Sequence, residues 1–419
     1  MLPRRIFGEL KEQSKNKKVS LLLGARQVGK TTMLKELYTE LSKNNKCLFF
    51  DLDIITNYEK VSTYEKLINT LKLNGYEEEQ KEFFYLFLDE FQKYHNMTRI
   101  MKNVYDNLNN VKIYASGSSS LMIKNQVQES LAGRKKINEI YSLDFEEFLW
   151  FKGGGDLAKK YKNIKKLRGE EIYQTIKEFN ELLEKFLIYG GYPEVTLKDS
   201  EKEKKEVLES IFDLYIKKDL VGYLNMEKIL EMKKLIEFLA VNNGQKIKYE
   251  EITKITSLSF NEIKRYIEIL KESYLIKELK PYYTNKKKEL VKIPKIYFLD
   301  NGVRNYFINN YNKLSLRDDK GLLFEGFIIS ELIKQGNKNL RFWQDKNFNE
   351  VDIILEKEGG PIPVEVKFKK ELKSEDFKGL EAFMKAYPKT RKDYLINLNT
   401  QKKSKRTILL LPYSLSSIN

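Results

Sequence analysis

Residues 24–32 read Gly24-Ala25-Arg26-Gln27-Val28-Gly29-Lys30-Thr31-Thr32 and directly follow the apolar run 19–23. This order satisfies the pattern G-x-x-x-x-G-K-[ST], which predicts a phosphate-binding loop between a strand and a helix. The glycines let backbone N–H groups close around a phosphate at the start of that helix. Lys30 is expected to contact the β- and γ-phosphates, and the Thr31 hydroxyl to bind Mg²⁺. The nine residues therefore predict a site for ATP and Mg²⁺.

Apolar segments alternate with amphipathic helical patterns around this loop. The expected strands cover residues 19–23, 47–52, 83–88 and 111–115, and a helix begins near Thr31. Strands that alternate with helices form parallel sheets. Residues 1–150 are therefore predicted to form an α/β domain with a parallel sheet.

The strand predicted over residues 83–88 ends in two acids, Asp89 and Glu90. The carboxyl ends of parallel strands meet at the edge where such a sheet binds its ligand. Asp89 is then expected to hold the Mg²⁺ shell, and Glu90 to orient and deprotonate the water that attacks the γ-phosphate. Together with the loop, these acids predict ATP hydrolysis.

Two further polar residues are candidates for the same site. Ser118 lies in the run 116–120, and either its hydroxyl faces the γ-phosphate or the run is an ordinary turn. Arg134 follows Gly133, and it is either an arginine finger that reaches the nucleotide of a neighbouring subunit or a surface residue. The finger interpretation predicts a homo-oligomer formed through the ATPase domain.

Three more domains are expected after residue 150. The glycines 153–155 close the first block, and residues 151–225 have the pattern of charged amphipathic helices that form a helical lid. Residues 226–305 have the order helix, helix, turn, helix, strand, strand, which predicts a winged-helix-like domain. Residues 306–419 have the order helix, three strands, helix, strand.

The last of these domains contains Asp352, Glu365 and Lys367 in the D-x₁₂-E-x-K spacing of the PD-(D/E)xK nuclease pattern. If the turn near Gly359 and Gly360 contains an even number of residues, Asp352 lies opposite Lys367 and diagonal to Glu365. Asp352 and Glu365 are candidate Mg²⁺ ligands, and Lys367 is a candidate for activating water. The alternative is that these are solvated residues of a chain in which 32% of residues are charged.

Glu325 is a fourth candidate for this site. It falls on the apolar stripe of a predicted helix, together with Ile328, Ile329 and Leu332. A carboxylate on such a stripe needs a partner, and a metal is one that fits. Glu325 is therefore expected to complete the acidic pocket.

The composition favours a polyanionic partner. The chain of 419 residues has 76 Lys and Arg against 60 Asp and Glu, a formal charge of +16. Nucleic acid is the first candidate, with DNA favoured; lysine-rich solvated helix faces are the alternative explanation. The single cysteine and single histidine exclude a disulfide framework and a histidine metal cluster. No apolar run is long enough to span a membrane and no signal peptide is evident, so a cytoplasmic location without a membrane partner is expected.

The segment predicted as a winged helix adds to the expectation of nucleic acid. Asn261, Lys264 and Arg265 face outward on its last helix, and Asn285-Lys286-Lys287-Lys288 would form a wing. Such groups suit phosphate contacts. A packing module between the ATPase and C-terminal domains is the alternative.

Several motifs along nearly the whole chain together resemble those of the prokaryotic AAA-family ATPases that carry a C-terminal restriction-endonuclease-like domain. The motifs are residues 24–32, Leu88-Asp89-Glu90-Phe91-Gln92-Lys93, Gly117-Ser118-Ser119-Ser120, Leu131-Ala132-Gly133-Arg134, Tyr189-Gly190-Gly191-Tyr192-Pro193-Glu194, residues 295–302 and the run from Glu325 to Lys367. This resemblance implies binding of ATP and Mg²⁺ and a nuclease-like fold.

The expected fold is therefore α/β: an AAA+ P-loop parallel sheet, a helical lid, a winged-helix module and a C-terminal α/β restriction-endonuclease-like domain. The expected function is ATP hydrolysis coupled to a DNA-binding, Mg²⁺-dependent nuclease-like domain. An ATP-driven switch or scaffold with an inert C-terminal domain is the alternative. A stand-alone phosphotransferase is disfavoured, because no second-substrate pocket can be named from the sequence.

Overall fold

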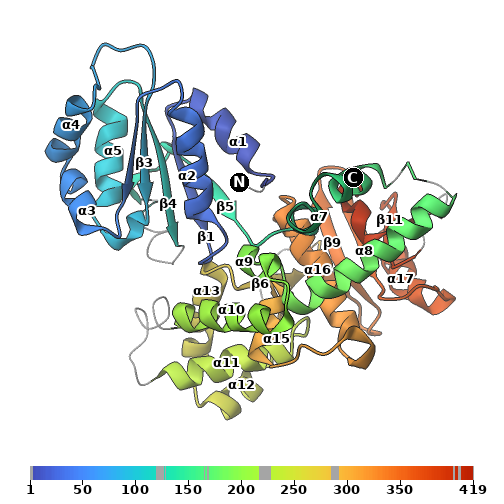
Figure 1. Ribbon diagram of the computed structural model, residues 1–419. Coiled ribbons are helices and arrows are strands. Elements are labelled where there is room, and N and C mark those ends of the chain that lie inside the picture. The colour runs from blue at the N-terminus through green and yellow to red at the C-terminus, as the bar shows by residue number, and fades with distance from the viewer. Residues whose placement is uncertain are drawn as a thin grey trace. The chain divides into compact units, whose positions relative to one another are not determined.

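The computed structural model describes residues 3–118, 127, 129–164, 166–167, 169–216, 228–284, 292–399, 402–403 and 407–418. They form two compact units (Figure 1). The first contains Met1–Ser142 and Glu268–Tyr274, and the second contains Leu143–Ile267 and Leu275–Asn419. The finer division predicted at residues 150, 225 and 305 stays a prediction.

A parallel sheet forms the centre of the first unit, as the alternation of strands and helices predicts. Among the residues described, its strand order is β2-β3-β4-β1-β5, and every neighbouring pair is parallel. All residues of β1, β3 and β4 are buried, which explains their nearly continuous apolar runs. The strands are β1 Val19–Gly24, β2 Cys47–Asp51, β3 Phe84–Asp89, β4 Val111–Ser118 and β5 Lys135–Ile140.

The helices of the first unit bury apolar side chains in its core. Leu34 and Leu37 of α2 and Val104 of α5 are buried. The Thr63 hydroxyl accepts a hydrogen bond from the Lys66 N–H and so caps α4. The helical segments are α1 Phe7–Glu12, η1 Gln13–Lys15, α2 Lys30–Leu41, α3 Ile55–Val61, α4 Tyr64–Leu73, η2 Phe91–Lys93 and α5 Met97–Asn107.

Long helices open the second unit. Asp144 and Glu147 form a capping box, so α7 begins at Phe145. The glycines 153–155 lie inside α7 rather than at the end of the first block, because only Gly154 leaves helical geometry, with φ 57° and ψ −137°. The helices of this unit include α7 Phe145–Asn163, α8 Gly169–Tyr189, α9 Pro193–Leu197, α10 Glu201–Leu214, α11 Ile229–Val241, α12 Tyr249–Thr256, α15 Asn301–Phe307, α16 Lys320–Lys334 and α17 Lys378–Ala386; α13 Phe260–Glu272 has residues in both units.

A mixed sheet runs through the second unit. In the described part of the chain its strand order is β12-β13-β11-β10-β9-β8-β6-β7. The order predicted for residues 306–419 corresponds to α16, β8, β9, β10, α17 and β11. β6 pairs with both β7 and β8, so the two strands predicted for the winged helix continue the C-terminal sheet. The strands are β6 Ile276–Pro281, β7 Lys295–Phe298, β8 Leu340–Gln344, β9 Glu350–Lys357, β10 Gly360–Val366, β11 Asp393–Ile396, β12 Lys402–Lys403 and β13 Thr407–Leu410.

Two of the quoted motifs, residues 189–194 and 295–302, meet at the Asp300 carboxylate. It accepts hydrogen bonds from the N–H groups of Gly191 and Gly302, each at 2.9 Å. Gly190 has a φ of 75°, and a Cβ at this position would lie 1.9 Å from Asp300 Oδ1. The motif glycines are thus explained by close packing around a buried carboxylate.

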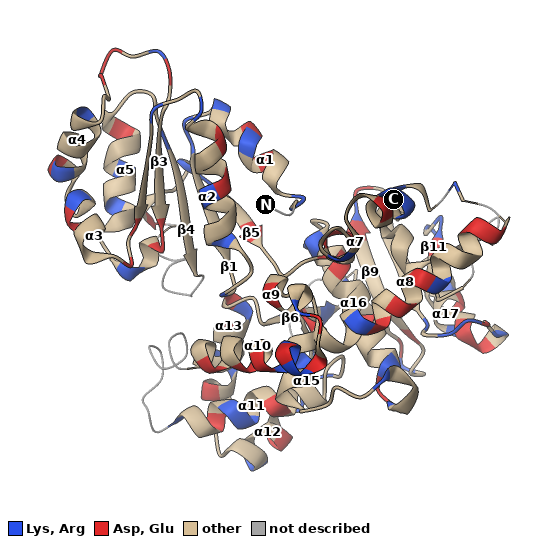
Figure 2. Ribbon diagram, viewed as in Figure 1, with Lys and Arg blue, Asp and Glu red and all other residues tan. Residues whose placement is uncertain are grey.

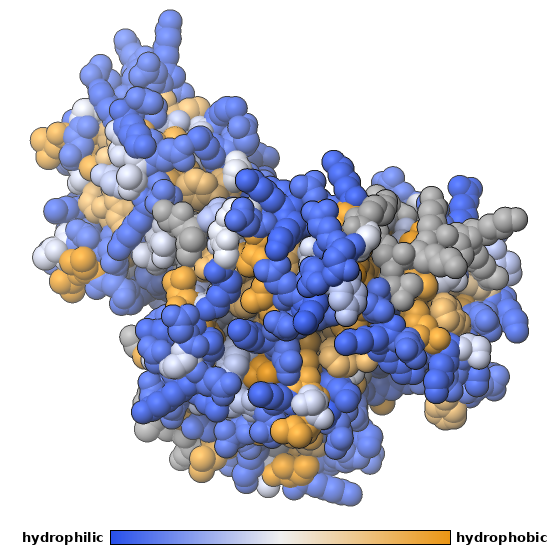
Figure 3. Space-filling model, turned by 45° about the vertical axis from the view of Figure 1, so that its right-hand side comes forward, coloured by the Kyte–Doolittle hydropathy of each residue, from blue (hydrophilic) through white to orange (hydrophobic). Residues whose placement is uncertain are grey.

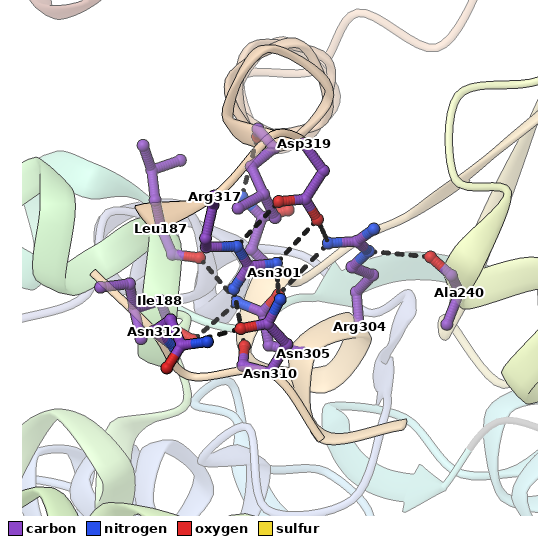
Figure 4. Close-up of polar contacts among 11 residues, drawn as sticks. Leu187, Ile188, Ala240, Asn301, Arg304, Asn305, Asn310, Asn312, Arg317 and Asp319 are labelled. Carbon is purple, nitrogen blue, oxygen red and sulfur yellow. Dashed lines mark hydrogen bonds and ion pairs between the residues drawn. The ribbon is translucent and has the colours of Figure 1, made fainter. Parts of the chain in front are cut away.

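A buried polar network joins α8, α11, α15 and the start of α16 (Figure 4). Asp319 accepts hydrogen bonds from Arg317 at 2.8 Å and also from Arg304. Arg304 Nε donates to the carbonyl of Ala240 at 2.8 Å, and Asn305 donates to the carbonyl of Ile188 at 2.8 Å. Because backbone carbonyls and the carboxylate satisfy these buried groups, the network fixes the four elements together.

Charged residues of both signs cover the surface. Figure 2 shows acidic and basic residues interspersed along α8 and α10, and the face seen in Figure 3 is mostly hydrophilic with smaller hydrophobic patches. Among the described helices, none is long and apolar enough to cross a membrane.

Candidate functional site

The loop 24–29 turns sharply between β1 and α2. Gln27 has a φ of 58° and Gly29 a φ of 96°, and Gly29 is the residue before the first helical position, Lys30. A Cβ at Gly24 would lie 2.0 Å from the Ile140 carbonyl oxygen of the neighbouring strand β5. The glycine positions of the motif are therefore required by a left-handed turn and by close strand contact.

Lys30 lies in the interior of this loop. Its side chain is buried, and Nζ donates hydrogen bonds to the carbonyls of Gly24 at 3.0 Å and Ala25 at 2.6 Å. Thr31, in the first turn of α2, is half-buried, and Thr32 is exposed. The ammonium group is thus held at the start of a helix, where phosphate oxygens are favoured partners.

Arg4 supports the same loop, although it belongs to none of the motifs. Its Nη1 donates to the Val28 carbonyl at 2.7 Å, and its Nη2 donates to the Tyr141 carbonyl at 2.9 Å. The guanidinium is buried. These two contacts join residues that are 24 and 137 positions apart in the sequence. No local sequence pattern indicates them, so only the folded chain reveals them.

The two predicted acids lie at the carboxyl end of β3. Asp89 is buried and accepts a hydrogen bond from the Ser116 hydroxyl, which comes from the neighbouring strand β4. Glu90 is half-buried and has a φ of 55°, an uncommon conformation for a residue with a side chain. The strained turn directs the chain into η2 immediately after the acid pair.

Gln92 connects Glu90 to Ser118. Its Nε2 donates to Glu90 Oε2 and, at 3.0 Å, to Ser118 Oγ. A Cβ on Gly117 would lie 2.7 Å from Gln92 Oε1, so this neighbour must be small for Gln92 to fit. The structure therefore brings together Glu90 and Ser118, and it adds Gln92, which the sequence contained only as part of a motif. Ser119 and Ser120 lie outside the described residues.

Arg134 lies away from its own phosphate loop. It directly precedes β5, and its carbonyl accepts a hydrogen bond from the N–H of Val19, the first residue of β1. Its Nε donates to Asp106 Oδ1 at 2.6 Å. Because the strands are parallel, Arg134 is at the opposite edge of the sheet from the loop that follows β1. A role in a neighbouring subunit's site stays a prediction.

The second predicted site begins with Glu325 on α16. This side chain is buried, accepts a hydrogen bond from the Tyr297 hydroxyl at 2.5 Å, and lies 3.9 Å from Lys295 Nζ. Lys295 Nζ also contacts Glu350 Oε1 at 2.5 Å. Tyr297 and Lys295 therefore belong to this acidic pocket, although the sequence contained them only as part of the motif 295–302.

The β9–β10 hairpin has a different register from the one expected. Glu356 pairs with Pro361 and Ile353 with Val364, so the expected pairing of Asp352 with Lys367 is wrong. The turn consists of residues 358–359, because Gly360, with a φ of 109°, is already paired. The β8–β9 register also shifts near residues 341–343. Asp352 Oδ2 instead accepts the N–H of Val366 at 2.8 Å.

Glu365 carries an unsatisfied buried oxygen. Its Oε1 accepts a hydrogen bond from Lys367 Nζ at 2.5 Å, whereas its Oε2 is buried and has no hydrogen-bond partner among the residues described. The first turn of α17 covers this oxygen, since a Cβ on Gly379 would lie 3.4 Å from it. Leaving a buried acceptor unpaired costs about 1–3 kcal/mol, more for a charged group.

Burial and mutual repulsion raise the pKa values of the carboxyl groups in this pocket. Burial, and next the nearby Asp352 carboxylate, raise the pKa of Glu325 to about 8, although Lys295 opposes this shift. Burial and then Asp352 raise the pKa of Glu365 well above its usual range. The carboxyl groups of Glu325, Glu350, Asp352 and Glu365 therefore outnumber the ammonium groups of Lys295 and Lys367 in the pocket. In the described part of the chain, however, no group of three or more His, Cys, Asp or Glu side chains is placed to hold a metal ion as it stands.

The segment predicted as a winged helix has its expected faces. Asn261, Lys264 and Arg265 of α13 are exposed, and Ile263 and Tyr266 are buried. The predicted wing, residues 285–288, lies outside the described residues. Contact with nucleic acid therefore stays a prediction.

Comparisons with known proteins agree with the geometry of the first unit. Residues 16–149 match a family model described as AAA domain, residues 180–314 match a domain of unknown function (DUF8612), and residues 320–415 match another (DUF4143). With the loop 24–32 and the acids at the end of β3, the match defines a P-loop protein of the AAA class. The restriction-endonuclease-like assignment is not among these matches.

The relatives found are uncharacterized. The chain is 30% identical to the uncharacterized protein MJ1544 of Methanocaldococcus jannaschii over 352 residues, 81% of this chain and 72% of that protein. It therefore belongs to the same family as MJ1544. The chain is also 28% identical to the uncharacterized protein MJ1637 of the same organism, and the match covers 62% of the length of MJ1637. The Walker-type ATPase PABY2304 of Pyrococcus abyssi is a structural neighbour, with 15% identity, a TM-score of 0.47, and coverage of 73% of this chain and 96% of that one.

Proposed function

We propose that the first unit binds ATP with Mg²⁺ and hydrolyses it. The observation that carries this proposal is the position of Glu90 directly after β3, held by Gln92, at the sheet edge that also carries the loop 24–29. Parallel sheets bind ligands at this edge.

Each residue would have a defined task in this site. Lys30 exchanges its bonds to backbone carbonyls for bonds to the β- and γ-phosphates. Thr31 and Asp89 would hold Mg²⁺, and the Ser116 hydroxyl orients Asp89 for this. Bound Mg²⁺ neutralises charge on the phosphate oxygens. Glu90 orients the attacking water and accepts its proton, and Gln92 positions Glu90 and Ser118.

Phosphate release from ATP tests this proposal. We expect Lys30→Ala to lose nucleotide affinity and turnover, because no other ammonium in the loop can replace its charge, and we expect EDTA to stop wild-type turnover. Lys35→Ala, at an exposed position on the same helix but outside the loop motif, is the matched charge control and should keep affinity. Equal turnover in Lys30→Ala and the wild type would contradict the proposal.

A second activity is supported by the buried carboxyl pocket of the second unit. We propose that Asp352 and Glu365 bind Mg²⁺ for phosphodiester hydrolysis of nucleic acid, DNA in particular. The unpaired Oε2 of Glu365 and the raised pKa values of Glu325 and Glu365 support a site that binds a cation. A bound divalent ion polarises the scissile phosphate. Lys367 would stabilise charge and Glu325 would complete the pocket; α13 would contact the phosphate backbone.

The scaffold interpretation remains the competitor of this second activity. Calorimetric titration with Mg²⁺ or Mn²⁺, and DNA cleavage assays with the same ions, separate the two. Glu365→Gln should lose metal affinity and cleavage, whereas Glu358→Gln, in the exposed hairpin turn, should keep both. Unchanged metal binding in Glu365→Gln, or no cleavage of any nucleic acid tested, would favour an ATP-driven switch or scaffold.

A further inference from the structure

A small cavity in the second unit lies among α7, α8, α9 and α10, outside both sites described above. Its volume is about 210 Å³, and its lining includes Lys152, Lys185, Thr196 and Lys204. Three lysines and Thr196 therefore line a space that is large enough for a small anion but too small for most cofactors.

The Thr196 hydroxyl is the first sign of a ligand. Thr196 is 2% exposed, and its Oγ1 is buried without a hydrogen-bond partner in the described residues. An unsatisfied buried hydroxyl costs about 1–3 kcal/mol, whereas valine has nearly the same shape without this cost. The hydroxyl lines a polar cavity, so a bound oxygen can supply the missing partner.

The three lysines are the second sign. Lys204 is 8% exposed, and its Nζ donates to the Asp199 carbonyl at 2.8 Å. Burial lowers the pKa of Lys204, and repulsion from Lys152 and Lys185 lowers it further. Asp199 is the one acidic residue in the lining; it lies 3.6 Å from Lys152 but its side chain is fully exposed. Positive charge in the cavity therefore exceeds negative charge.

We propose that this cavity binds a phosphate-type oxyanion, either free phosphate or the phosphate group of a small monoester. Thr196 Oγ1 would donate one hydrogen bond to it, and Lys152, Lys185 and Lys204 would supply charge-assisted bonds. The oxyanion would relieve the repulsion among the lysines and would satisfy the buried hydroxyl. The bound oxyanion would then add a contact between α7 and α10 to the one that they share through residues 198–199.

Calorimetric titration with inorganic phosphate tests the proposal in the Lys30→Ala variant of the full chain, because the phosphate loop of the first unit would otherwise compete. We expect one phosphate per chain. Thr196→Val and Lys185→Met should each raise the dissociation constant by about tenfold or more, as expected for loss of a bond to a charged group. Lys185 is exposed, so its replacement leaves the fold intact.

Lys202→Met is the matched charge control, since Lys202 lies on the same helix as Lys204 with its side chain 86% exposed. It should leave the affinity unchanged. A parallel titration with phenyl phosphate distinguishes free phosphate from a monoester: tighter binding of either identifies the source. No binding at about 10 mM of both compounds, or equal loss in Lys202→Met and Lys185→Met, would overturn the proposal.

Discussion

Single side chains fix the positions of the two acids at the end of β3. Ser116 donates to Asp89, and Gln92 donates to Glu90. Ser116 lies in β4, and Gln92 lies in η2, the short helical turn that follows β3. Replacing Gln92 would leave the carboxylate of Glu90 in place as a chemical group but would remove the hydrogen bond that orients it. Gln92 is therefore a positioning residue, whereas Glu90 is the proposed catalytic one.

Lys112 shows how burial of one side chain makes stability depend on pH. It is fully buried in β4, where Nζ donates to the Ser20 hydroxyl at 2.8 Å. Burial lowers its pKa to about 7 from an ordinary value of 10.5. Between these two values the unfolded chain binds more protons than the folded chain, so the free energy of unfolding rises with pH.

We predict that Lys112→Met removes this part of the pH dependence. Urea unfolding at several pH values between 7.5 and 9.5 should show a slope of up to about 1.4 kcal/mol per pH unit from Lys112 in the wild type, and a correspondingly smaller slope in the variant. Lys43→Met, at an exposed position, is the control and should keep the wild-type slope. Identical slopes for Lys112→Met and the wild type would refute the assignment.

Asp319 connects helices that are far apart in the chain. Its carboxylate accepts hydrogen bonds from Arg317 and Arg304 (Figure 4). Arg304 donates to the Ala240 carbonyl in α11, whereas Arg317 donates to Asn305, which in turn donates to the Ile188 carbonyl in α8. Burial alone would raise the pKa of Asp319, but hydrogen bonds from Arg317 and Arg304 lower it to about 2. The charged form is therefore stabilised in the folded chain.

We predict that Asp319→Asn lowers the free energy of unfolding by about 3 kcal/mol, because two buried guanidinium groups lose their counter-charge. Chemical denaturation at pH 7 measures this, with Asp318→Asn at an exposed position as the control. In the wild type the contribution should be complete above about pH 4 and lost as the pH falls through about 2. A change below about 0.5 kcal/mol in Asp319→Asn would show that the network contributes little.

The helices and strands were more predictable than their long-range partners. Residues 24–32 and the apolar runs have local patterns, and these patterns correctly predicted the parallel sheet and the loop before α2. The predicted pairing of β9 with β10 was wrong by two residues. Either Gly359 or Gly360 suits the turn, and the sequence does not indicate which of them is already paired in the hairpin. The first strand of the segment predicted as a winged helix begins only at Ile276, because Tyr274 has a left-handed φ of 57°.

The site residues also differ in whether a local sequence motif or only a long-range contact identifies them. Lys30, Asp89 and Glu90 belong to motifs with fixed spacing, and the structure places them at one sheet edge. Arg4 and Lys295 act through contacts with residues far along the chain, which no periodicity reveals. Sequence reasoning therefore finds groups that the chemistry requires and misses those that only position them.

Assembly of several chains is the next level at which the account can be tested. Arg134 lies at the sheet edge opposite its own phosphate loop and is paired with Asp106, so any nucleotide that it contacts would belong to a neighbouring subunit. We predict that Arg134→Ala and Lys30→Ala subunits, each inactive alone, regain ATP turnover when mixed. In a random ring, about a quarter of the interfaces would combine an intact loop with an intact arginine.

The mixing experiment needs proof that both variants enter one oligomer, which differently tagged subunits and co-purification provide. Asp106→Asn serves as a companion variant: it frees Arg134 from its partner within the chain and should keep turnover. If a verified mixed oligomer shows no recovery, Arg134 has a structural role with Asp106 instead.

ATP hydrolysis that depends on Glu90 can be separated from nucleotide binding by comparing the wild type with Glu90→Gln. Nucleotide affinity and single-turnover phosphate release are measured for the wild type and Glu90→Gln with Mg²⁺ present. The account predicts unchanged affinity and a rate of phosphate release lower by about 10²-fold or more, because the amide cannot accept the proton of the attacking water. An equal rate in Glu90→Gln and the wild type would contradict the account.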